Sequence, residues 1–267
     1  MKKIIYIFLI LICIAVLAYN AYTIVFWMID NKNNSKEFDE ISQVAELREI
    51  EDTENVEFIN PPADEADNYW EYVKQPLLDV SIDELLKVNP DTVGYINVLG
   101  TDIDYPVVQA KDNQYYLTHS FKRETSKAGW VFADYQNNMI DLNKNTVIYG
   151  HNRLDKAQFG TLKNVLKSNW LNDKNNYIVK MSTVKENTLW QVFSVYSISA
   201  ENYYITKEFK NDEEYTGWIK TALERSVYDF NTTVDKNDKV LTLSTCQSNN
   251  NKVRIVLQAK LIKKAAR

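Results

Sequence analysis

Three residues of this chain carry the side chains that acyl transfer requires: Cys246, His151 and Arg254. A thiolate attacks a carbonyl carbon, an imidazole exchanges a proton with the amine that leaves or enters, and a guanidinium stabilises the oxyanion or the bound backbone. Each residue alone has an ordinary explanation, since a lone cysteine at a strand end is usually a small core residue. Together they indicate a cysteine enzyme that works through a thioester.

We expect these three residues to lie at the ends or starts of neighbouring strands. The strands concerned span residues 146–149, followed by Gly150, and residues 239–245 and 253–262. His151 follows the first of them and Cys246 follows the second. If the last two strands pair as a hairpin, the loop between them returns Arg254 to the side of Cys246. The site would then lie at one edge of a sheet.

The cysteine and histidine content narrows the chemistry further. Cys13 lies in an apolar N-terminal run, so Cys246 is the only cysteine beyond that run and has no partner for an internal disulfide. With only His119 and His151 beside it, a cysteine-rich zinc site is excluded. We expect no cofactor. Nothing around His119 suggests a cysteine partner, so His151 is the expected catalytic histidine.

The N-terminus predicts a membrane anchor. Lys2 and Lys3 precede an apolar run over residues 4–28, and no charge appears until Asp30. About 20 such residues cross a bilayer, whereas the apolar part of a cleaved signal peptide is shorter, about 7 to 15 residues. We therefore expect residues 1–30 to be an uncleaved signal-anchor helix, with its positively charged N-terminus in the cytoplasm and the catalytic part outside.

Charge separates the remainder into two parts. Residues 31–68 contain twelve acidic and three basic residues, a net charge of −9, whereas residues 69–267 carry +3. We interpret the first part as an acidic, solvated stalk and find no basic surface suited to nucleic acid. Five of its apolar residues recur at roughly helical spacing and allow a short amphipathic helix: Phe38, Ile41, Val44, Ala45 and Leu47.

The part from residue 69 onward reads mainly as strands. Short β-rich runs alternate with turns as far as a long strand near the C-terminus. One helix interrupts the late strands near residues 212–226, with Asn211 as its N-cap and acidic residues in its first turn. This pattern favours a closed or partly closed barrel with accessory helices.

Five segments resemble a known family. TLSTC at residues 242–246 and RIVLQAKL at 254–261 resemble the active-site hairpin of sortases, and IYGHN at 148–152 resembles their histidine segment. YPVVQ at 105–109 and GWVFAD at 129–134 are similar to class B sortases in particular. The segments arrive in the family's order between about residues 70 and 264, and class B members insert a helix where residues 212–226 lie.

The resemblance implies a closed β-barrel of about eight strands with N-terminal helices and a cysteine transpeptidase of the Gram-positive cell surface. Such enzymes cut the C-terminal sorting signal of a secreted protein after threonine and transfer the protein to an amine of a peptidoglycan precursor resembling lipid II. It implies Cys246 as nucleophile, His151 as general acid and base, and Arg254 as stabiliser of the substrate and oxyanion. It further implies five substrate-binding residues: Ser244, Tyr204, Ile205, Thr245 and Asn152. It implies no metal.

Three alternatives stay open at this point. A close variant is a sortase that polymerises pilin subunits, in which a lysine side chain is the acceptor. A second is an extracellular cysteine peptidase or hydrolase, in which water accepts the acyl group. The third is a surface binding module without catalytic activity, in which Cys246 is merely buried.

Overall fold

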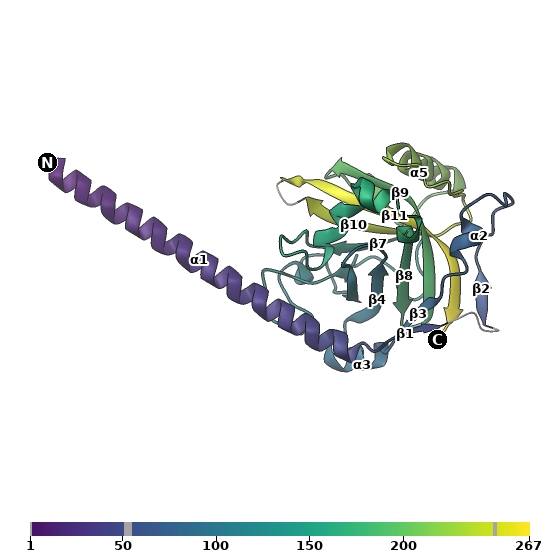
Figure 1. Ribbon diagram of the computed structural model, residues 1–267, viewed down its shortest axis with the longest axis horizontal. Helices are drawn as coiled ribbons and strands as arrows, with labels where there is room; N and C mark the ends of the chain where they lie inside the picture. The colour runs from purple at the N-terminus through teal and green to yellow at the C-terminus, as the bar shows by residue number, and fades with distance from the viewer. Residues whose placement is uncertain (1, 51–54, 248–249) are drawn as a thin grey trace.

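The computed structural model describes residues 2–50, 55–247 and 250–267. The side chains of Lys2, of residues 246 and 247, and of residues 250–252 lie outside this description, although the backbone there belongs to a helix or strand. Figure 1 shows one β-rich domain from which a single long helix projects.

The projecting helix, α1, spans Lys2–Val44 and is 43 residues long. Neither proline nor glycine occurs within it, so nothing in the sequence interrupts its hydrogen-bond ladder. In its N-terminal half the large apolar side chains are exposed to solvent. Among the described residues, α1 is the one helix long and apolar enough to cross a membrane.

The second part of α1 confirms the helix that the apolar spacing allowed, with its apolar face packed on the domain, whereas the acidic composition suggested a solvated stalk. The side chains of Asn34, Glu37 and Ile41 are buried against the domain. Asn34 Nδ2 donates to Ser126 Oγ at 2.9 Å, and the backbone amide of Lys122 donates to Glu37 Oε1 at 2.7 Å. The acidic and polar residues on this face have partners in the domain, so residues 31–44 continue the apolar helix and dock it instead of forming a spacer.

The domain is a closed β-barrel, as the sequence predicts. Eight strands follow one another in the order β10-β7-β6-β5-β4-β8-β9-β11, and pairing of β10 with β11 closes the ring, while β2 adds to the outer edge of β11 and β1 pairs with β3. The strands are β1 Leu47–Ile50, β2 Val56–Phe58, β3 Leu77–Val80, β4 Thr92–Val98, β5 Asp104–Val108, β6 Phe132–Ala133, β7 Asn145–Gly150, β8 Ile178–Thr183, β9 Glu186–Ser199, β10 Val240–Gln247 and β11 Asn250–Ala266.

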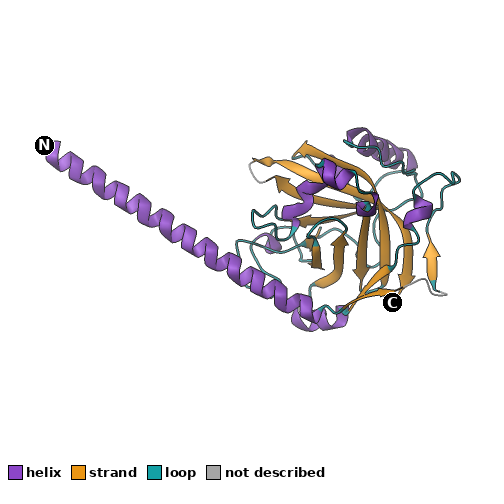
Figure 2. Cartoon of the chain, in the orientation of Figure 1, coloured by secondary structure: helices purple, strands orange, loops and turns teal. Residues whose placement is uncertain are grey.

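Short helices connect the strands or cover them, and Figure 2 shows α1 and α5 on the outside of the strands. The expected late helix is confirmed as α5, Asp212–Arg225, whose first turn is capped by Asn211 Oδ1 accepting from the amide of Glu214 at 2.9 Å. Tyr215 and Trp218 bury its apolar face. The other helices are α2 Tyr69–Tyr72, α3 Ile82–Val88, α4 Ser168–Leu171, and the 3-10 turns η1 Tyr115–Leu117, η2 Phe159–Leu166, η3 Lys174–Asn176 and η4 Tyr203–Ile205.

The largest hydrophobic core joins barrel strands to the docked helices. Trp130, Trp190 and Tyr95 are fully buried in it, and Ile41 of α1 belongs to the same cluster. Because apolar burial is the main favourable term in folding, this continuity ties the base of α1 firmly to the barrel.

Candidate active site

The pairing of three strands gathers the expected catalytic residues at one edge of the barrel. β10 runs parallel to β7, with Thr245 beside Gly150, and His151 directly follows β7. β10 also pairs antiparallel with β11, and there Cys246 lies opposite Arg254. The expected hairpin is thus confirmed, with strands that run closer to the turn than expected. The side chain of Cys246 lies outside the described residues, so its placement is that of the backbone.

The imidazole of His151 is held from one side. Its Nε2 lies 3.1 Å from the carbonyl oxygen of Leu117, at the end of η1. A carbonyl only accepts hydrogen bonds, so Nε2 carries the proton and Nδ1 is the atom able to accept another. Burial lowers the pKa of His151 below its ordinary value of 6.5; the charge of nearby Arg153 lowers it too, and the bond to Leu117 opposes both. The ring is therefore neutral near pH 7.

Two residues behind His151 fix its surroundings. Gly129 has a positive φ of 59°, and a Cβ there would lie 2.8 Å from the carbonyl oxygen of Leu117 and 2.9 Å from Cδ2 of His151. Buried Gln158 donates through Nε2 to the carbonyls of Ala128 and Gly129 at 2.8 and 2.9 Å, and its Oε1 accepts from the amide of His151 at 3.3 Å. Gln158 itself adopts a φ of 51°, a left-handed conformation that non-glycine residues rarely hold.

A cavity of about 200 Å³ opens over these residues. Its walls combine the histidine and arginine with apolar and hydroxyl side chains. They are Asn113, Leu117, Phe132, Tyr149, Gly150, His151, Ser244, Thr245 and Arg254. A mostly apolar pocket with a few converging polar groups is the usual form of a small-ligand or peptide site.

Two of the five expected substrate-binding residues line this cavity, and the other three do not. Ser244 and Thr245 line it, and buried Tyr204 lies 3.0 Å from Ser244, hydroxyl to hydroxyl. The hydroxyl of Thr245 is buried with no hydrogen-bond partner among the described residues. Ile205 lines a neighbouring cavity of about 470 Å³, which shares Asn113 with the first. Asn152 lines neither of these two cavities; its backbone forms a bridge to Gln158.

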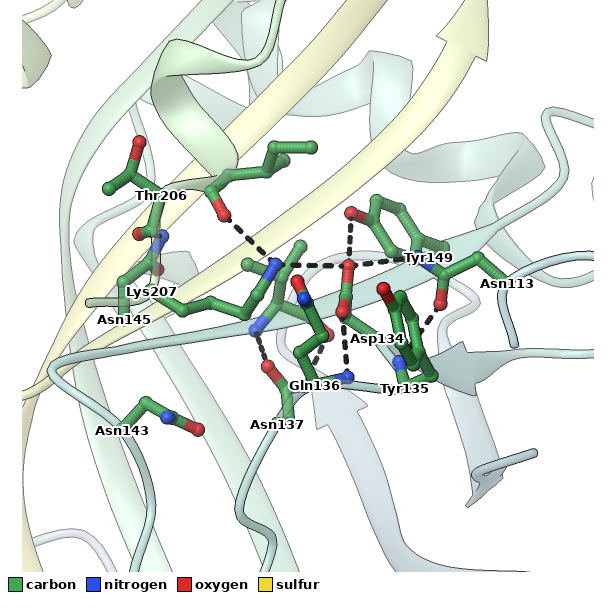
Figure 3. Close-up of polar contacts among 12 residues, drawn as sticks. Asn113, Asp134, Tyr135, Gln136, Asn137, Asn143, Asn145, Tyr149, Thr206 and Lys207 are labelled. Carbon is green, nitrogen blue, oxygen red and sulfur yellow. Dashed lines mark hydrogen bonds and ion pairs between the residues drawn. The ribbon is translucent and has the colours of Figure 1, made fainter. Parts of the chain in front are cut away.

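A buried ion pair connects the wall of the first cavity with the segment that carries Ile205. The side chains of Asp134 and Lys207 are 2% and 10% exposed, and they lie 3.2 Å apart. Asp134 Oδ2 also accepts from Tyr149 Oη at 2.9 Å and from Asn113 Nδ2 at 3.0 Å, as Figure 3 shows. Burial raises the pKa of Asp134, but these bonds, the amide of Gln136 and the charge of Lys207 outweigh it, so the net shift is downward.

His119 lies apart from this arrangement. Its ring stacks on Tyr115 with centroids 4.0 Å apart, and its Nδ1 lies 2.8 Å from the carbonyl oxygen of Tyr115. It does not line the cavity beside His151. Within the described part of the chain, no group of three or more His, Cys, Asp or Glu side chains is arranged to hold a metal.

Sequence reasoning assigned no role to several residues that shape the site. The carbonyl of Leu117 and the side chains of Gln158, Asp134 and Lys207 act through contacts between segments far apart in the chain. The signals available were Gly129 and Asp134 inside the GWVFAD segment, since a glycine before a strand often marks a close backbone approach.

The comparisons with known proteins agree on one family. A family model described as the sortase domain matches residues 96–262. Sortase B of Listeria monocytogenes is 37% identical over 183 residues, which are 68% of this chain and 74% of that protein. A crystal structure of sortase B from B. anthracis has a TM-score of 0.71 at 31% identity and covers 88% of this chain and 99% of that one. The Staphylococcus aureus sortase B–substrate complex has a TM-score of 0.63 at 35% identity, covering 68% of this chain and 84% of that one.

Proposed function

The chain belongs to the sortase family of cysteine transpeptidases, with sortase B enzymes as its relatives, and from this premise we propose that it anchors secreted proteins to the cell wall. The substrate is a protein with a C-terminal sorting signal, which the enzyme cuts after threonine. The acyl part passes through a thioester on Cys246 to an amine of a peptidoglycan precursor resembling lipid II.

The observation that carries this proposal is the strand register around β10. It sets Cys246 opposite Arg254 on β11 and sets Thr245 beside Gly150, one residue before His151. The backbone positions of a nucleophile, a proton carrier and a cation are therefore neighbours on, or directly after, three adjoining strands, which is the combination of groups that acyl transfer requires. We assign Cys246 as nucleophile, His151 as general acid and base, and Arg254 as the group that stabilises the substrate and oxyanion.

The proton can be followed from atom to atom. The thiol proton of Cys246 passes to Nδ1 of His151 as the sulfur–carbon bond forms, and the same proton then leaves with the departing amine as the carbon–nitrogen bond breaks. An incoming amine attacks the thioester carbonyl and forms the new carbon–nitrogen bond, and its proton passes to His151. His151 then gives this proton to the sulfur as the carbon–sulfur bond breaks, which releases the thiol. Throughout, the bond from Nε2 to the carbonyl of Leu117 holds the ring in the required tautomer.

Substrate recognition follows from the two neighbouring cavities. We assign Ser244 and Thr245 to the peptide beside the cleaved bond, since both line the cavity that contains His151. The hydroxyl of Tyr204 holds the hydroxyl of Ser244 in place, and Ile205 would contact the part of the peptide that lies in the second cavity. Asn152 contributes through the backbone that leads away from His151. The sortase B of S. aureus, a relative in structure, has been solved as a substrate complex.

Location follows from α1. We assign residues 1–30 as a single-pass anchor with a cytoplasmic N-terminus and the catalytic domain outside the cell, since Lys2 and Lys3 precede the apolar run. The catalytic unit comprises residues 69–267, and residues 31–44 dock on it.

A peptide library tests the proposal. The full chain in detergent is incubated with a library of peptides, each containing a pentapeptide with a threonine and varied neighbouring residues. Each reaction is run with and without hydroxylamine, and mass spectrometry identifies the products. We expect cleavage after threonine and a hydroxamate on the new C-terminus. Cleavage that yields only the free acid in the presence of hydroxylamine would identify a hydrolase, and no cleavage of any peptide would contradict the proposal.

A further inference from the structure

The contacts between α1 and the domain fix where the domain lies along the helix axis relative to the apolar run. Ser126 donates to Asp30, the first charged residue after that run, at 2.9 Å. One helical turn closer to the N-terminus, the ammonium of Lys127 lies 5.1 Å from the ring centre of Phe26. The loop that carries Ser126 and Lys127 therefore reaches past the end of the polar part of α1 and along its apolar part.

A second loop reaches the same level. Arg153 Nη2 donates to Asn31 Oδ1 at 2.5 Å, one residue after Asp30. The next residue, Leu154, is 72% exposed, and Lys156 is also exposed. Figure 1 shows the C-terminal part of α1 beside the domain and its N-terminal part projecting away from it. We call residues 122–127 and 152–157 the membrane-facing loops.

The length of the apolar run places these loops next to the surface of a bilayer that the run crosses. Residues 4–29 span about 39 Å at about 1.5 Å per residue. The hydrocarbon core of a bilayer is about 30 Å thick, so the end of the run near Phe26 falls at the headgroup level. An exposed leucine with basic residues close to it in the loop, as Leu154 has in Arg153 and Lys156, is suited to that level.

The charge of the membrane-facing loops indicates which kind of lipid surface they would bind. They contain five basic residues against two acidic ones, but Lys122 and Arg123 pair with Glu40 and Asp91 on neighbouring segments. One of the acids, Asp155, is bound to Arg153 at 2.5 Å, whereas Glu124 is exposed. Lys127 and Lys156 are exposed and have no acidic partner in the part of the chain that the structure describes. Basic side chains near a membrane are attracted by anionic lipid.

We propose that the catalytic domain lies with its membrane-facing loops on an anionic lipid surface. The proposal rests on α1 spanning the membrane, as proposed above. His151 precedes the second loop directly, so the cavity that it lines opens beside the bilayer. The amine of a lipid-linked acceptor can then reach the thioester while its lipid stays in the membrane. If a spacer held the domain away from the bilayer, the acceptor would have to be long enough to cross that distance.

Fluorescence quenching tests this orientation. The full chain with Cys13→Ala and Cys246→Ala receives one new cysteine, Leu154→Cys, which is labelled and reconstituted in vesicles that contain phosphatidylglycerol and a headgroup nitroxide lipid. The matched control is Val227→Cys, at a 60% exposed position two residues after the end of α5. We expect the label at 154 to be quenched more strongly than the label at 227, because only position 154 would lie at the level of the lipid headgroups.

Each outcome decides the proposal. Equal quenching at the two positions, with the chain resistant to carbonate extraction, would show that the anchor is correct and the orientation wrong. Release of the chain by carbonate would overturn the anchor and, with it, the orientation, while leaving the peptide cleavage untouched. A Lys127→Gln/Lys156→Gln variant should lower quenching at 154 in phosphatidylglycerol vesicles and not in phosphatidylcholine alone; an unchanged value in both would contradict the role of anionic lipid.

Discussion

The imidazole of His151 donates from Nε2 to the carbonyl oxygen of Leu117 across 3.1 Å. The acceptor is a backbone atom at the end of a 3-10 turn, so no side-chain substitution removes it directly. The bond fixes the tautomer, and burial keeps the ring neutral by lowering its pKa. The arrangement therefore prepares Nδ1 to take a proton, as the first step of acylation requires.

Acylation should persist to a pH below the ordinary histidine pKa. Burial lowers the pKa of His151 from 6.5, so the ring stays neutral, and able to accept a proton, until the pH falls below that value. Single-turnover acylation measured against pH should show its acid limb below 6.5. Arg153→Gln removes a charge that helps to lower the pKa of His151, so the acid limb of the pH profile of this variant should move to higher pH. A wild-type acid limb above 6.5 would contradict this account of the ring.

Gly129→Ala should reduce activity strongly. The new Cβ would press on the carbonyl oxygen of Leu117 at 2.8 Å and on the His151 ring at 2.9 Å, at a φ of 59° that alanine rarely adopts. We expect kcat to fall at least about tenfold, because a misplacement of about 1 Å near the reacting groups costs up to about a hundredfold. Gly217→Ala is the matched control: nothing lies within 4 Å of its added Cβ. In α5 alanine should raise stability by up to about 1 kcal/mol. Equal activity of the two variants would contradict the packing role of Gly129.

Removing one partner of the Asp134–Lys207 pair should destabilise the domain. Both side chains are buried, so Asp134→Asn leaves an uncompensated charge and should cost about 3 kcal/mol in the free energy of unfolding. The double variant Asp134→Asn/Lys207→Met should recover part of that loss, and denaturant titration measures both.

The pH dependence of stability provides a separate check on the same pair. The pKa of Asp134 lies below its ordinary value of 3.8, so its contribution is present above that pH and is lost as the pH falls further. The stability difference between wild type and Asp134→Asn should therefore shrink below pH 3.8. A difference that stays constant through this range would mean that the ionised carboxylate is not what stabilises the cluster.

The hydroxyl contact between Tyr204 and Ser244 should act on substrate binding more than on chemistry. Ser244 lines the cavity and Tyr204 lies behind it, 3.0 Å away. Tyr204→Phe should raise KM for a cleaved peptide severalfold, consistent with a hydrogen bond of about 1 kcal/mol, and leave kcat near its wild-type value. A double-mutant cycle with Ser244→Ala should show that the two effects are not additive. Full additivity would exclude a functional contact between the two hydroxyls.

The sequence was sufficient for the local features of this protein. Short β-rich runs separated by a polar loop predicted β10 and β11 and their hairpin, and Asn211 with three following acidic residues predicted the start of α5. Family motifs supplied the closed barrel. These features depend on residues that are close in the chain or on patterns that one segment carries alone.

What the sequence missed depends on contacts between distant segments. Residues 31–44 read as a stalk because their acidic side chains have no visible partners in sequence, yet Glu37 accepts from the amide of Lys122. Similarly, Lys207 and Asp134 are separated by more than seventy residues, and no local pattern pairs them. A buried polar residue is recognisable only once its partner is known.

The thioester on Cys246 is the central claim, and trapping it is the most direct test. The full chain is mixed with a cleavable sorting peptide, quenched in acid and digested, and the mass of each cysteine peptide is measured. The account predicts an acyl adduct on the peptide that contains Cys246, unchanged by Cys13→Ala, abolished by Cys246→Ala and removed by an added amine with formation of the amide. Cleavage that continues in Cys246→Ala, or an adduct that an amine never captures, would contradict it.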